Sequence, residues 1–395
     1  MTIQNWKKMD ISPKISFIKG KAPKTLINNP EPGYILYLTP ELLRGNSPSI
    51  EYCSEKESIS VSNNEVIILW DGSNAGEIFK AKTGALASTM ARINIQSLAI
   101  DSSYLFYFLK NYEYRIKNQV RGSGIPHVDR KVFSELPDDF PLNLSEQRKI
   151  AEILTTLDDT IEQTEALIHK YHRIKQGLMQ DLLKVKESWT ILPLGIACKK
   201  GGGSVQTGPF GSQLHSCDYK DEGIPIITVE HLGDNEIIHK DLPLVGHEDY
   251  LRLSKYKIIT GDLVFSRVGA IDRCAYVSEN ENEWLFSGRL LRVRPGSLFD
   301  SRFLSYLLNH HPSRLWILNN SVGSIMKCLN TTILSELPIH IPSMTEQKEI
   351  SEEISSIDRL IRDSVQEMEK LSPIKQGLMQ DLLTGKVRVN ALLKN

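Results

Sequence analysis

Ile174 to Leu183 reads Ile-Lys-Gln-Gly-Leu-Met-Gln-Asp-Leu-Leu, and the same ten residues return without a change at Ile374 to Leu383. Two copies 200 residues apart do not make a solenoid, in which short units stack in series. The flanks match as well, since Ser145-Glu146-Gln147 corresponds to Thr345-Glu346-Gln347. The sequence therefore predicts an internal duplication, in which a variable region followed by a repeated segment occurs twice.

The repeated segments carry the pattern of long amphipathic helices. Apolar or small residues recur at spacings of three and four, which is typical of a coiled-coil seam. Lys175 and Lys375 interrupt this seam at the same place in both copies. Because two matching helices in one chain can bury their seams against each other, we expect an antiparallel coiled coil. The residues predicted to form the core of this helix pair are Leu154, Leu157, Ile161, Ile168, Leu178, Leu182, Ile354, Ile357, Ile361, Met368, Leu378 and Leu382.

Local signals predict where these helices begin and how long they are. Ser145 and Thr345, each a few residues past a proline, are the predicted N-caps. Pro373 is predicted to kink or restart the second helix, with Ser372 as its cap. At 1.5 Å per residue, about 33 residues give a rod of roughly 50 Å, longer than the roughly 34–36 Å of one DNA turn. An antiparallel pair of this length would hold two similar domains apart.

The two variable regions lack helical periodicity over most of their length and contain strand signals instead. Short apolar runs at 65–70, 224–229 and 262–265, bounded by Gly, Asp and Ser turn residues, are typical of buried strands. Each region also contains one helical stretch, at Tyr104–Ile116 in the first and at Phe303–Leu318 in the second. These patterns predict two α+β domains, each with a sheet in its core.

The order of these segments gives the domain organisation. We expect a first domain at 1–143, a central helix at 144–187, a second domain at 188–342 and a C-terminal helix at 343–395. The expected fold class is α+β, with two sheet-containing domains separated by two long antiparallel coiled-coil helices. Because of this duplication, we expect a pseudo-two-fold axis to relate the two halves.

Composition points to a reducing compartment. No apolar run approaches the roughly 18–20 residues of a membrane span, and the first residues lack a secretory signal pattern. Five cysteines, odd in number and scattered, argue against a disulfide framework, so we expect a cytoplasmic protein without a membrane partner.

The net charge of −1 lacks the basic footprint typical of nucleic-acid binding. Any such charge must be local, as in the basic clusters at 110–131 and 289–302.

Each motif that suggests catalysis is incomplete. Asn29-Pro30-Glu31-Pro32 has a glutamate where a methyltransferase box needs its second proline, and Ala81 replaces the glycine that a nucleotide-binding loop needs before its lysine. Asp138-Asp139 lacks the closely spaced lysine of a nuclease site, and His215 with Cys217 lacks a second pair of zinc ligands. We therefore expect no catalytic residue, no metal site and no cofactor in this chain.

The helix starts, the helix ends and two loops together resemble a known family. The helix starts are Pro141 to Ile150 and Ile341 to Ile350, and the helix ends are Gly177 to Leu183 and Gly377 to Lys386. The loops are Thr207-Gly208-Pro209-Phe210-Gly211-Ser212 and Gly122-Ser123-Gly124-Ile125-Pro126-His127. In combination, over essentially the whole chain, these motifs resemble the specificity subunits of type I restriction-modification systems.

The resemblance implies a non-catalytic, DNA-binding subunit of a restriction system with two target recognition domains. Each domain would read one half of a split, asymmetric sequence in double-stranded DNA. The helical pair would set the unspecified gap between the halves and dock two methyltransferase subunits, through which restriction and translocase subunits would join. DNA methylation at adenine, translocation and cleavage would reside in those partners, which would bind S-adenosylmethionine, ATP and Mg.

Base reading requires hydrogen-bond donors and acceptors on loops that are held against a groove. By this criterion the candidate DNA-binding residues of the first domain are Ser73, Asn74, Thr89, Arg121, Ser123 and His127. The candidates of the second domain are Thr207, Phe210, Ser212, Gln213, Arg267, Arg289, Ser324 and Lys327.

Two other classes of function stay open at this stage. A DNA methyltransferase or nuclease with its own recognition domain would bind S-adenosylmethionine as an isolated chain. A scaffold whose variable domains bind protein is favoured by the near-zero net charge. DNA binding restricted to a bipartite site would exclude the scaffold.

Overall fold

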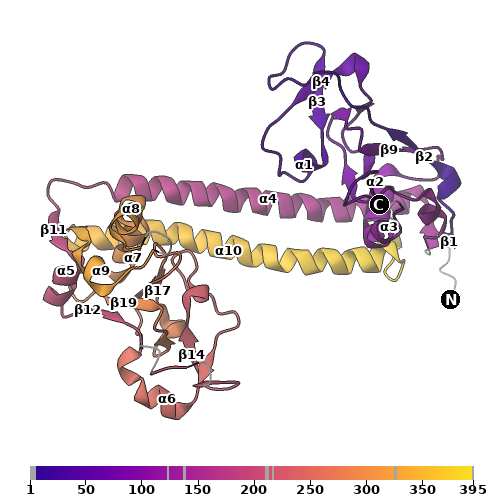
Figure 1. Cartoon of the computed structure of the whole chain (residues 1–395). Coiled ribbons are helices and arrows are strands. Elements are labelled where there is room, and N and C mark those ends of the chain that lie inside the picture. The colour runs from indigo at the N-terminus through magenta and orange to yellow at the C-terminus, as the bar shows by residue number, and fades with distance from the viewer. Residues whose placement is uncertain are drawn as a thin grey trace. The chain divides into compact units, whose positions relative to one another are not determined.

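A computed structural model describes residues 6–121, 124–136, 139–209, 213–215, 218–323 and 327–393 of the chain. Two long helices, α4 (Leu144–Leu182) and α10 (Met344–Leu383), accompany two groups of strands and shorter helices (Figure 1). The chain forms two compact units, of which unit 1 is Met1–Ala166 with Val365–Asn395 and unit 2 is Leu167–Ser364. Each unit therefore contains one variable region and one half of each long helix. Among the described residues, no helix combines the length and the apolar character that crossing a bilayer requires.

The strands of unit 1 form two sheets and one separate strand pair. In chain order they are β1 (Trp6–Lys8), β2 (Ile15–Lys19), β3 (Tyr34–Leu38), β4 (Tyr52–Ser54), β5 (Ser60–Val61), β6 (Val66–Leu69), β7 (Ile78–Lys80), β8 (Gly84–Leu86), β9 (Met90–Ile95) and β10 (Asp139–Pro141). One sheet has the order β2-β9-β6-β7 and is antiparallel throughout. The other has the order β4-β3-β8-β5, in which β3 and β8 run parallel, and β1 pairs with β10.

Unit 2 repeats the antiparallel sheet and the separate strand pair of unit 1, whereas its other sheet has a different strand order. Its strands are β11 (Thr190–Pro193), β12 (Ser204–Thr207), β13 (Tyr219–Lys220), β14 (Ile224–Ile227), β15 (Leu244–Val245), β16 (Leu263–Ser266), β17 (Cys274–Tyr276), β18 (Leu285–Phe286), β19 (Leu290–Arg294) and β20 (Pro338–Ile341). The antiparallel sheet β12-β19-β16-β17 corresponds to β2-β9-β6-β7, and β11 pairs with β20 as β1 pairs with β10. In the other sheet, β13-β15-β14-β18, the parallel pair is β14 with β18.

These sheets confirm the predicted α+β class and the predicted duplication. The apolar runs expected as strands are confirmed too, because they form β6, β14 and β16. All four residues of β6 and of β16 are buried, as expected of strands covered on both faces.

Each predicted helical stretch is divided into two helices. The shorter α-helices are α1 (Pro40–Leu43), α2 (Ser102–Asn111), α3 (Glu113–Asn118), α5 (Leu194–Lys200), α6 (His247–Arg252), α7 (Ser301–Asn309), α8 (His311–Asn320) and α9 (Thr331–Glu336). The break between α7 and α8 lies at His310, whose backbone is extended, and Pro312 then occupies the first turn of α8. A proline there favours a new helix start rather than a continuing helix.

The apolar core of each unit includes residues from both long helices. In unit 1, Leu154 of α4 and Leu382 of α10 belong to the cluster that contains Phe108 and Phe140. In unit 2, Leu183, directly after α4, belongs to one cluster with Ile350 and Ile354 of α10. The start of one helix therefore packs beside the end of the other in both units, which confirms that the pair is antiparallel.

The seam residues assigned from the sequence lie inward. All twelve are buried or half-buried, and the most completely buried are Leu154 and Ile354, each with no exposed surface. A helix half that presents its apolar stripe to a matching helix half removes that surface from water, which stabilises the pair by roughly 25 cal/mol per Å² of apolar area.

The predicted helix caps are wrong by two residues. The helices begin at Leu144 and Met344, so Ser145 and Thr345 lie inside the first turn. The capping side chains are Asn143, whose Oδ1 accepts from the Ser145 amide at 2.9 Å, and Ser343, whose Oγ accepts from the Glu346 amide at 3.3 Å. Both residue types satisfy the open amides of a first helical turn.

The predicted restart at Pro373 is also wrong, because α10 runs through this proline without interruption. A proline inside a helix removes one backbone hydrogen bond and crowds the preceding turn. The long apolar seam on both sides of Pro373 outweighs that local cost, since α10 continues to Leu383.

A buried glutamine at the start of each long helix fastens the helix to its domain. The Gln147 Nε2 donates to the carbonyls of Ala99 and Pro141, both at 2.8 Å, and its Oε1 accepts from the Asp101 amide at 2.7 Å. Gln347 makes the equivalent bonds, with its Nε2 donating at 3.1 Å to Leu298 and to Pro342. Its Oε1 accepts from the Asp300 amide at 2.9 Å. The repeated Glu-Gln pair of the sequence is therefore a structural joint.

The glutamate before each of these glutamines pairs with the residues that follow the other helix. Glu146 is buried and accepts two hydrogen bonds from the Arg388 guanidinium, at 2.6 and 3.0 Å, in unit 1. Glu346 accepts from Lys186 Nζ at 2.6 Å in unit 2. Arg388 also lies over the Trp6 ring, as Lys186 lies over Trp189.

We predict that Gln147→Ala destabilises unit 1 by about 2–4 kcal/mol, because two carbonyls and one amide lose a buried partner together. Hydrogen exchange at the Asp101 amide measures the effect directly, and this amide should exchange much faster in the variant. Gln163→Ala, at an exposed glutamine of the same helix, is the matched control and should leave it unchanged. Equal exchange rates in the two variants would contradict the joint.

Candidate nucleic-acid interface

Three loops of unit 2 meet at one end of the β12-β19-β16-β17 sheet. The first loop follows β16, and the second connects β18 to β19. The amide of Arg267 in the first loop donates to the carbonyl of Arg289 in the second at 2.9 Å. In the third loop, Val322 and Cys328 exchange two backbone hydrogen bonds, at 3.2 and 2.8 Å. The Leu329 amide then donates to the Arg267 carbonyl at 2.9 Å. We call this cluster the three-loop end of unit 2.

Unit 1 has the same three-loop end, held by equivalent bonds. The Trp70 amide donates to the Thr89 carbonyl at 2.8 Å, as Arg267 does to Arg289. Arg121 and His127 exchange two backbone hydrogen bonds, at 2.9 and 2.8 Å, and the Val128 amide donates to the Trp70 carbonyl at 3.0 Å. The backbone frame is therefore shared by the two units while the side chains on it differ.

A fourth segment packs against each three-loop end through a glycine. The Gly208 amide donates to the Leu290 carbonyl, and a Cβ at Gly208 would lie 2.1 Å from the carbonyl oxygen of Ser287. Gly20 occupies the equivalent place in unit 1, where a Cβ would lie 2.2 Å from the carbonyl oxygen of Ala87. Any side chain would push the segment away, so this close approach requires glycine.

The three-loop end of unit 2 encloses a pocket that carries positive charge. The pocket has a volume of about 360 Å³ and is lined by Arg267, Val268, Gly288, Arg289, Val322, Cys328, Leu329 and Asn330. Arg289 is exposed, whereas Arg267 is half-buried and reaches the Gly288 carbonyl at 3.5 Å. Burial raises the pKa of the Tyr219 phenol on β13, and the positive charge of Arg289 partly offsets this increase. Guanidinium groups in such a position suit phosphate oxygens and the acceptor edge of guanine.

The structure gathers five of the fourteen candidate DNA-binding residues into the backbone contacts that define the two three-loop ends. These five are Thr89, Arg121, His127, Arg267 and Arg289. Ser73 and Asn74 are exposed in the turn after β6, next to Gly72, whose amide donates to the Pro126 carbonyl of the third loop. Thr207 ends β12 and directly precedes Gly208, so it lies at the same end of unit 2.

Three candidates make side-chain contacts within their own unit, of which the first is Arg121, whose Nε lies 2.5 Å from Oδ2 of Asp129. Gln213 accepts from the Tyr256 hydroxyl at 2.6 Å through Oε1, and its carbonyl accepts from Arg252 at 2.7 Å. Lys327 donates to the Leu318 carbonyl at 2.7 Å, near the end of α8. The candidates Ser123, Phe210, Ser212 and Ser324 lie outside the described residues, as do Asp138 and Cys217 of the motifs considered for catalysis.

The structure adds two basic residues that sequence reasoning missed. Lys19 is the equivalent of Thr207, because each directly precedes the close-packed glycine, and it pairs with Asp71 at 2.6 Å. Arg130 is exposed beside the third loop of unit 1, and its guanidinium lies over the rings of Phe17 and Trp70 at 5.6 and 5.4 Å. Arg130 belongs to the basic cluster visible in the sequence, whereas nothing in the sequence aligns Lys19 with Thr207.

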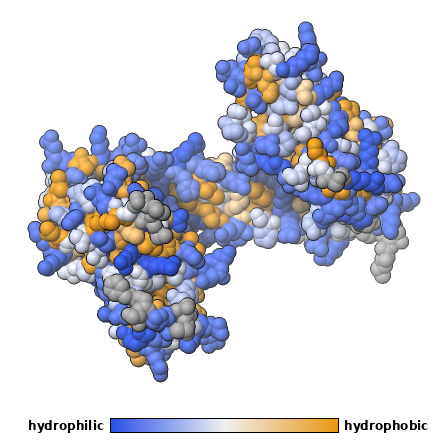
Figure 2. Space-filling view, in the orientation of Figure 1, coloured by the Kyte–Doolittle hydropathy of each residue, from blue (hydrophilic) through white to orange (hydrophobic). Residues whose placement is uncertain are grey.

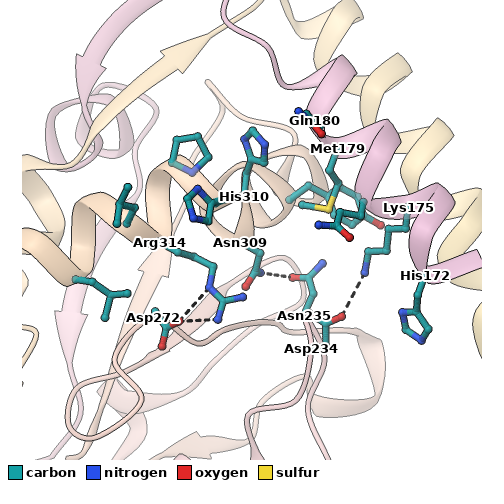
Figure 3. Close-up of a pocket in the computed structure, with 16 residues that line it drawn as sticks. His172, Lys175, Met179, Gln180, Asp234, Asn235, Asp272, Asn309, His310 and Arg314 are labelled. Carbon is teal, nitrogen blue, oxygen red and sulfur yellow. Dashed lines mark hydrogen bonds and ion pairs between the residues drawn. The ribbon is translucent and has the colours of Figure 1, made fainter. Parts of the chain in front are cut away.

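A larger pocket in unit 2 has a different character. Its volume is about 840 Å³, and it lies between the second half of α4 and the helices α7 and α8 (Figure 3). Its charged side chains are paired internally, since Arg314 contacts Asp272 at 2.6 Å and Lys175 lies 3.7 Å from Asp234. Burial lowers the pKa of His310 at its rim. With its charges neutralised from within, this pocket is a poorer site for a polyanion than the three-loop end.

Most of the visible face of each unit is hydrophilic, with smaller hydrophobic areas between (Figure 2). Among the described residues, no group of three or more His, Cys, Asp and Glu side chains is arranged to hold a metal. The near-match to a nucleotide-binding loop is part of a sheet, because Ile78–Lys80 forms β7 instead of a phosphate-binding turn. Lys80 packs against Tyr107, with its Nζ 3.0 Å from the hydroxyl.

Comparison with known proteins gives one family. The family model for the type I restriction modification DNA specificity domain matches the chain twice, at residues 4–170 and 206–371. The type I restriction enzyme MjaVIII specificity subunit of Methanocaldococcus jannaschii is 30% identical, over 98% of this chain and 94% of that protein. The EcoBI specificity subunit of Escherichia coli is 23% identical, over 89% of this chain and 79% of its own length.

A solved structure shares the fold. The S subunit of a type I restriction-modification system from M. genitalium superposes with a TM-score of 0.68 at 16% sequence identity, and the match covers 96% of both chains. The duplicated frame is therefore kept although most of the sequence has changed.

Proposed function

This chain belongs to the family of type I restriction-modification DNA specificity subunits, and we propose that its two units divide the recognition of DNA between them. It is a specificity subunit and not a catalytic one. In our proposal each unit reads one half of a bipartite, asymmetric sequence in double-stranded DNA. The three-loop end of each unit contacts the bases of its half-site.

The main support for this proposal is that the two three-loop ends have the same backbone frame but different side chains. The Trp70-to-Thr89 bond of unit 1 and the Arg267-to-Arg289 bond of unit 2 are the same backbone contact. A shared frame places both loop clusters against a groove in the same way. Different side chains on that frame, such as Thr89 against Arg289, then select different bases.

The near-zero net charge is compatible with this proposal because the positive charge is concentrated. The three-loop end of unit 2 carries Arg267 and Arg289, and Arg130 flanks that of unit 1. Binding through few phosphate contacts weakens with salt less steeply than binding through many. We propose that further phosphate contacts come from partner subunits.

We propose that α4 and α10 set the gap between the half-sites and dock two methyltransferase subunits. With 39 and 40 residues, each helix is about 60 Å long at 1.5 Å per residue, more than one turn of DNA. The duplication offers two equivalent partner surfaces, one in each unit. Restriction subunits would join through the methyltransferase subunits, and S-adenosylmethionine, ATP and Mg would bind in these partners. We also propose a cytoplasmic location, in keeping with the buried free thiols of Cys53, Cys198 and Cys274.

We predict that Arg289→Ala weakens binding of the complex to its own DNA site by about 10- to 100-fold, as expected for loss of one base contact of about 1–3 kcal/mol. Fluorescence anisotropy with the methyltransferase complex and a labelled duplex measures this loss. Base discrimination should relax only in the half-site read by unit 2. The control is Lys199→Ala. Lys199 is exposed on α5, which precedes β12, whereas the three-loop end lies beyond the end of that strand, so this variant should bind DNA as the unaltered protein does. Undiminished affinity of Arg289→Ala would place the interface elsewhere.

We predict that four residues inserted into α4 after Ala166 lengthen the gap by about one or two base pairs, since four helical residues span about 6 Å. The sequences of both half-sites should stay the same. Sequencing of methylated DNA from cells that carry the variant reports both properties at once. A changed half-site with an unchanged gap would refute the role of the helices.

A further inference from the structure

The second half of α4 carries a buried lysine that contacts α10. Lys175, in the apolar seam, has only 11% of its side chain exposed, and its Nζ lies 2.8 Å from Oδ1 of Asp358. The Tyr306 hydroxyl of α7 donates to the other oxygen, Oδ2, of the same carboxylate at 2.6 Å. Lys175 faces Asp234 of the neighbouring loop as well, at 3.7 Å (Figure 3). One carboxylate therefore links both long helices to the recognition domain of unit 2.

The same triad exists in unit 1, made by the other members of the duplication. Lys375 of α10 lies 2.5 Å from Oδ1 of Asp158 on α4, and the Tyr107 hydroxyl of α2 donates to Oδ2 of Asp158 at 2.7 Å. Lys175 and Lys375 are 200 residues apart, as are Asp158 and Asp358. Both lysine–aspartate pairs therefore correspond to one and the same antiparallel register. We call these two groups the Tyr-Asp-Lys triads.

An apolar seam does not by itself select one register. Leucine and isoleucine side chains pack almost equally well after the helices slide by one repeat, because dispersion and burial are non-directional. A charged residue inside the seam discriminates, since sliding by one turn of about 5.4 Å would leave it without its partner. Buried polar groups fix the register of coiled coils by this mechanism, at some cost in stability.

The tyrosines extend this constraint to the recognition domains. Burial raises the pKa of both Tyr107 and Tyr306, and the adjacent carboxylates raise it further, so each phenol stays protonated and donates a hydrogen bond to the aspartate. The helix that carries each tyrosine packs in the same core as the strands below the three-loop end. A change of helix register would therefore pull on the recognition domain through the shared aspartate.

We propose that the two Tyr-Asp-Lys triads fix the axial register of the helix pair and thereby restrict the complex to one gap length between its half-sites. This inference rests on the proposed function of the helices as the element that sets the gap. It assigns Lys175, Asp358 and Tyr306, with Lys375, Asp158 and Tyr107, as positioning residues for specificity. None of them needs to touch DNA.

The test uses the full-length chain co-expressed with its methyltransferase subunits. The DNA is a plasmid library in which the two half-sites are separated by gaps up to two base pairs shorter or longer than the native one. We expect Lys175→Met to raise methylation at the neighbouring gap lengths, relative to the native gap, by about tenfold. Tyr306→Phe, which removes only one hydroxyl, should raise this ratio less. Lys170→Met, at an exposed lysine of the same helix, should leave it unchanged.

Reversal of the pair provides the rescue. The double variant Lys175→Asp with Asp358→Lys restores opposite charges in the same register and should return the ratio toward its native value. A purely structural role would lower methylation equally at every gap length, and that uniform loss in Lys175→Met and Tyr306→Phe would overturn the inference. So would an equal effect of Lys170→Met.

The four-residue insertion in α4, assayed on the same library, separates this inference from the proposed function. If the insertion shifts the preferred gap while Lys175→Met and Tyr306→Phe leave the ratio unchanged, the triads do not set the register and only the inference fails. If the insertion leaves the preferred gap in place, the helices do not set it, and the proposed function fails with the inference.

Discussion

Each of the two long helices has an apolar seam whose exposure to water is unfavourable, and the matching seam of the other helix covers it. This mutual burial is the constraint on which the rest of the structure depends. Because the helices run antiparallel within each unit, the start of one always lies beside the end of the other. Both recognition domains therefore meet the same combination of helix ends. The joints at Gln147 and Gln347 are equivalent, and each fastens the start of one helix to its own domain.

In our proposal, specificity and architecture depend on different residues of this frame. The backbone contacts of the three-loop ends, the close-packed glycines and the glutamine joints recur in both units. The side chains carried by the loops do not recur, as Thr89 and Arg289 show. A frame of this kind allows the exposed loop side chains to change without disturbing the core, because exposed side chains contribute little to its packing.

The sequence was sufficient to predict features that depend on repetition or on apolar pattern. The exact repeat at 174–183 and 374–383 predicted the duplication, and the seam predicted which residues lie inward. The helix caps and the helix restart at Pro373 were misjudged, because local signals compete with seam burial that extends over many residues. The partners of Lys175 and Lys375 could not be predicted, since an antiparallel register is set by three-dimensional packing. The equivalence of Lys19 and Thr207 emerged only when Gly20 and Gly208 were seen against the same turn.

We propose that this chain directs modification to one DNA sequence made of two separated halves. Genome-wide sequencing of methylated adenines in cells with and without the intact gene tests this role. We expect one asymmetric motif, with two specified halves and an unspecified gap of fixed length, that disappears when the gene is deleted. A contiguous motif lost on deletion, or methylation unchanged by deletion, would exclude the role.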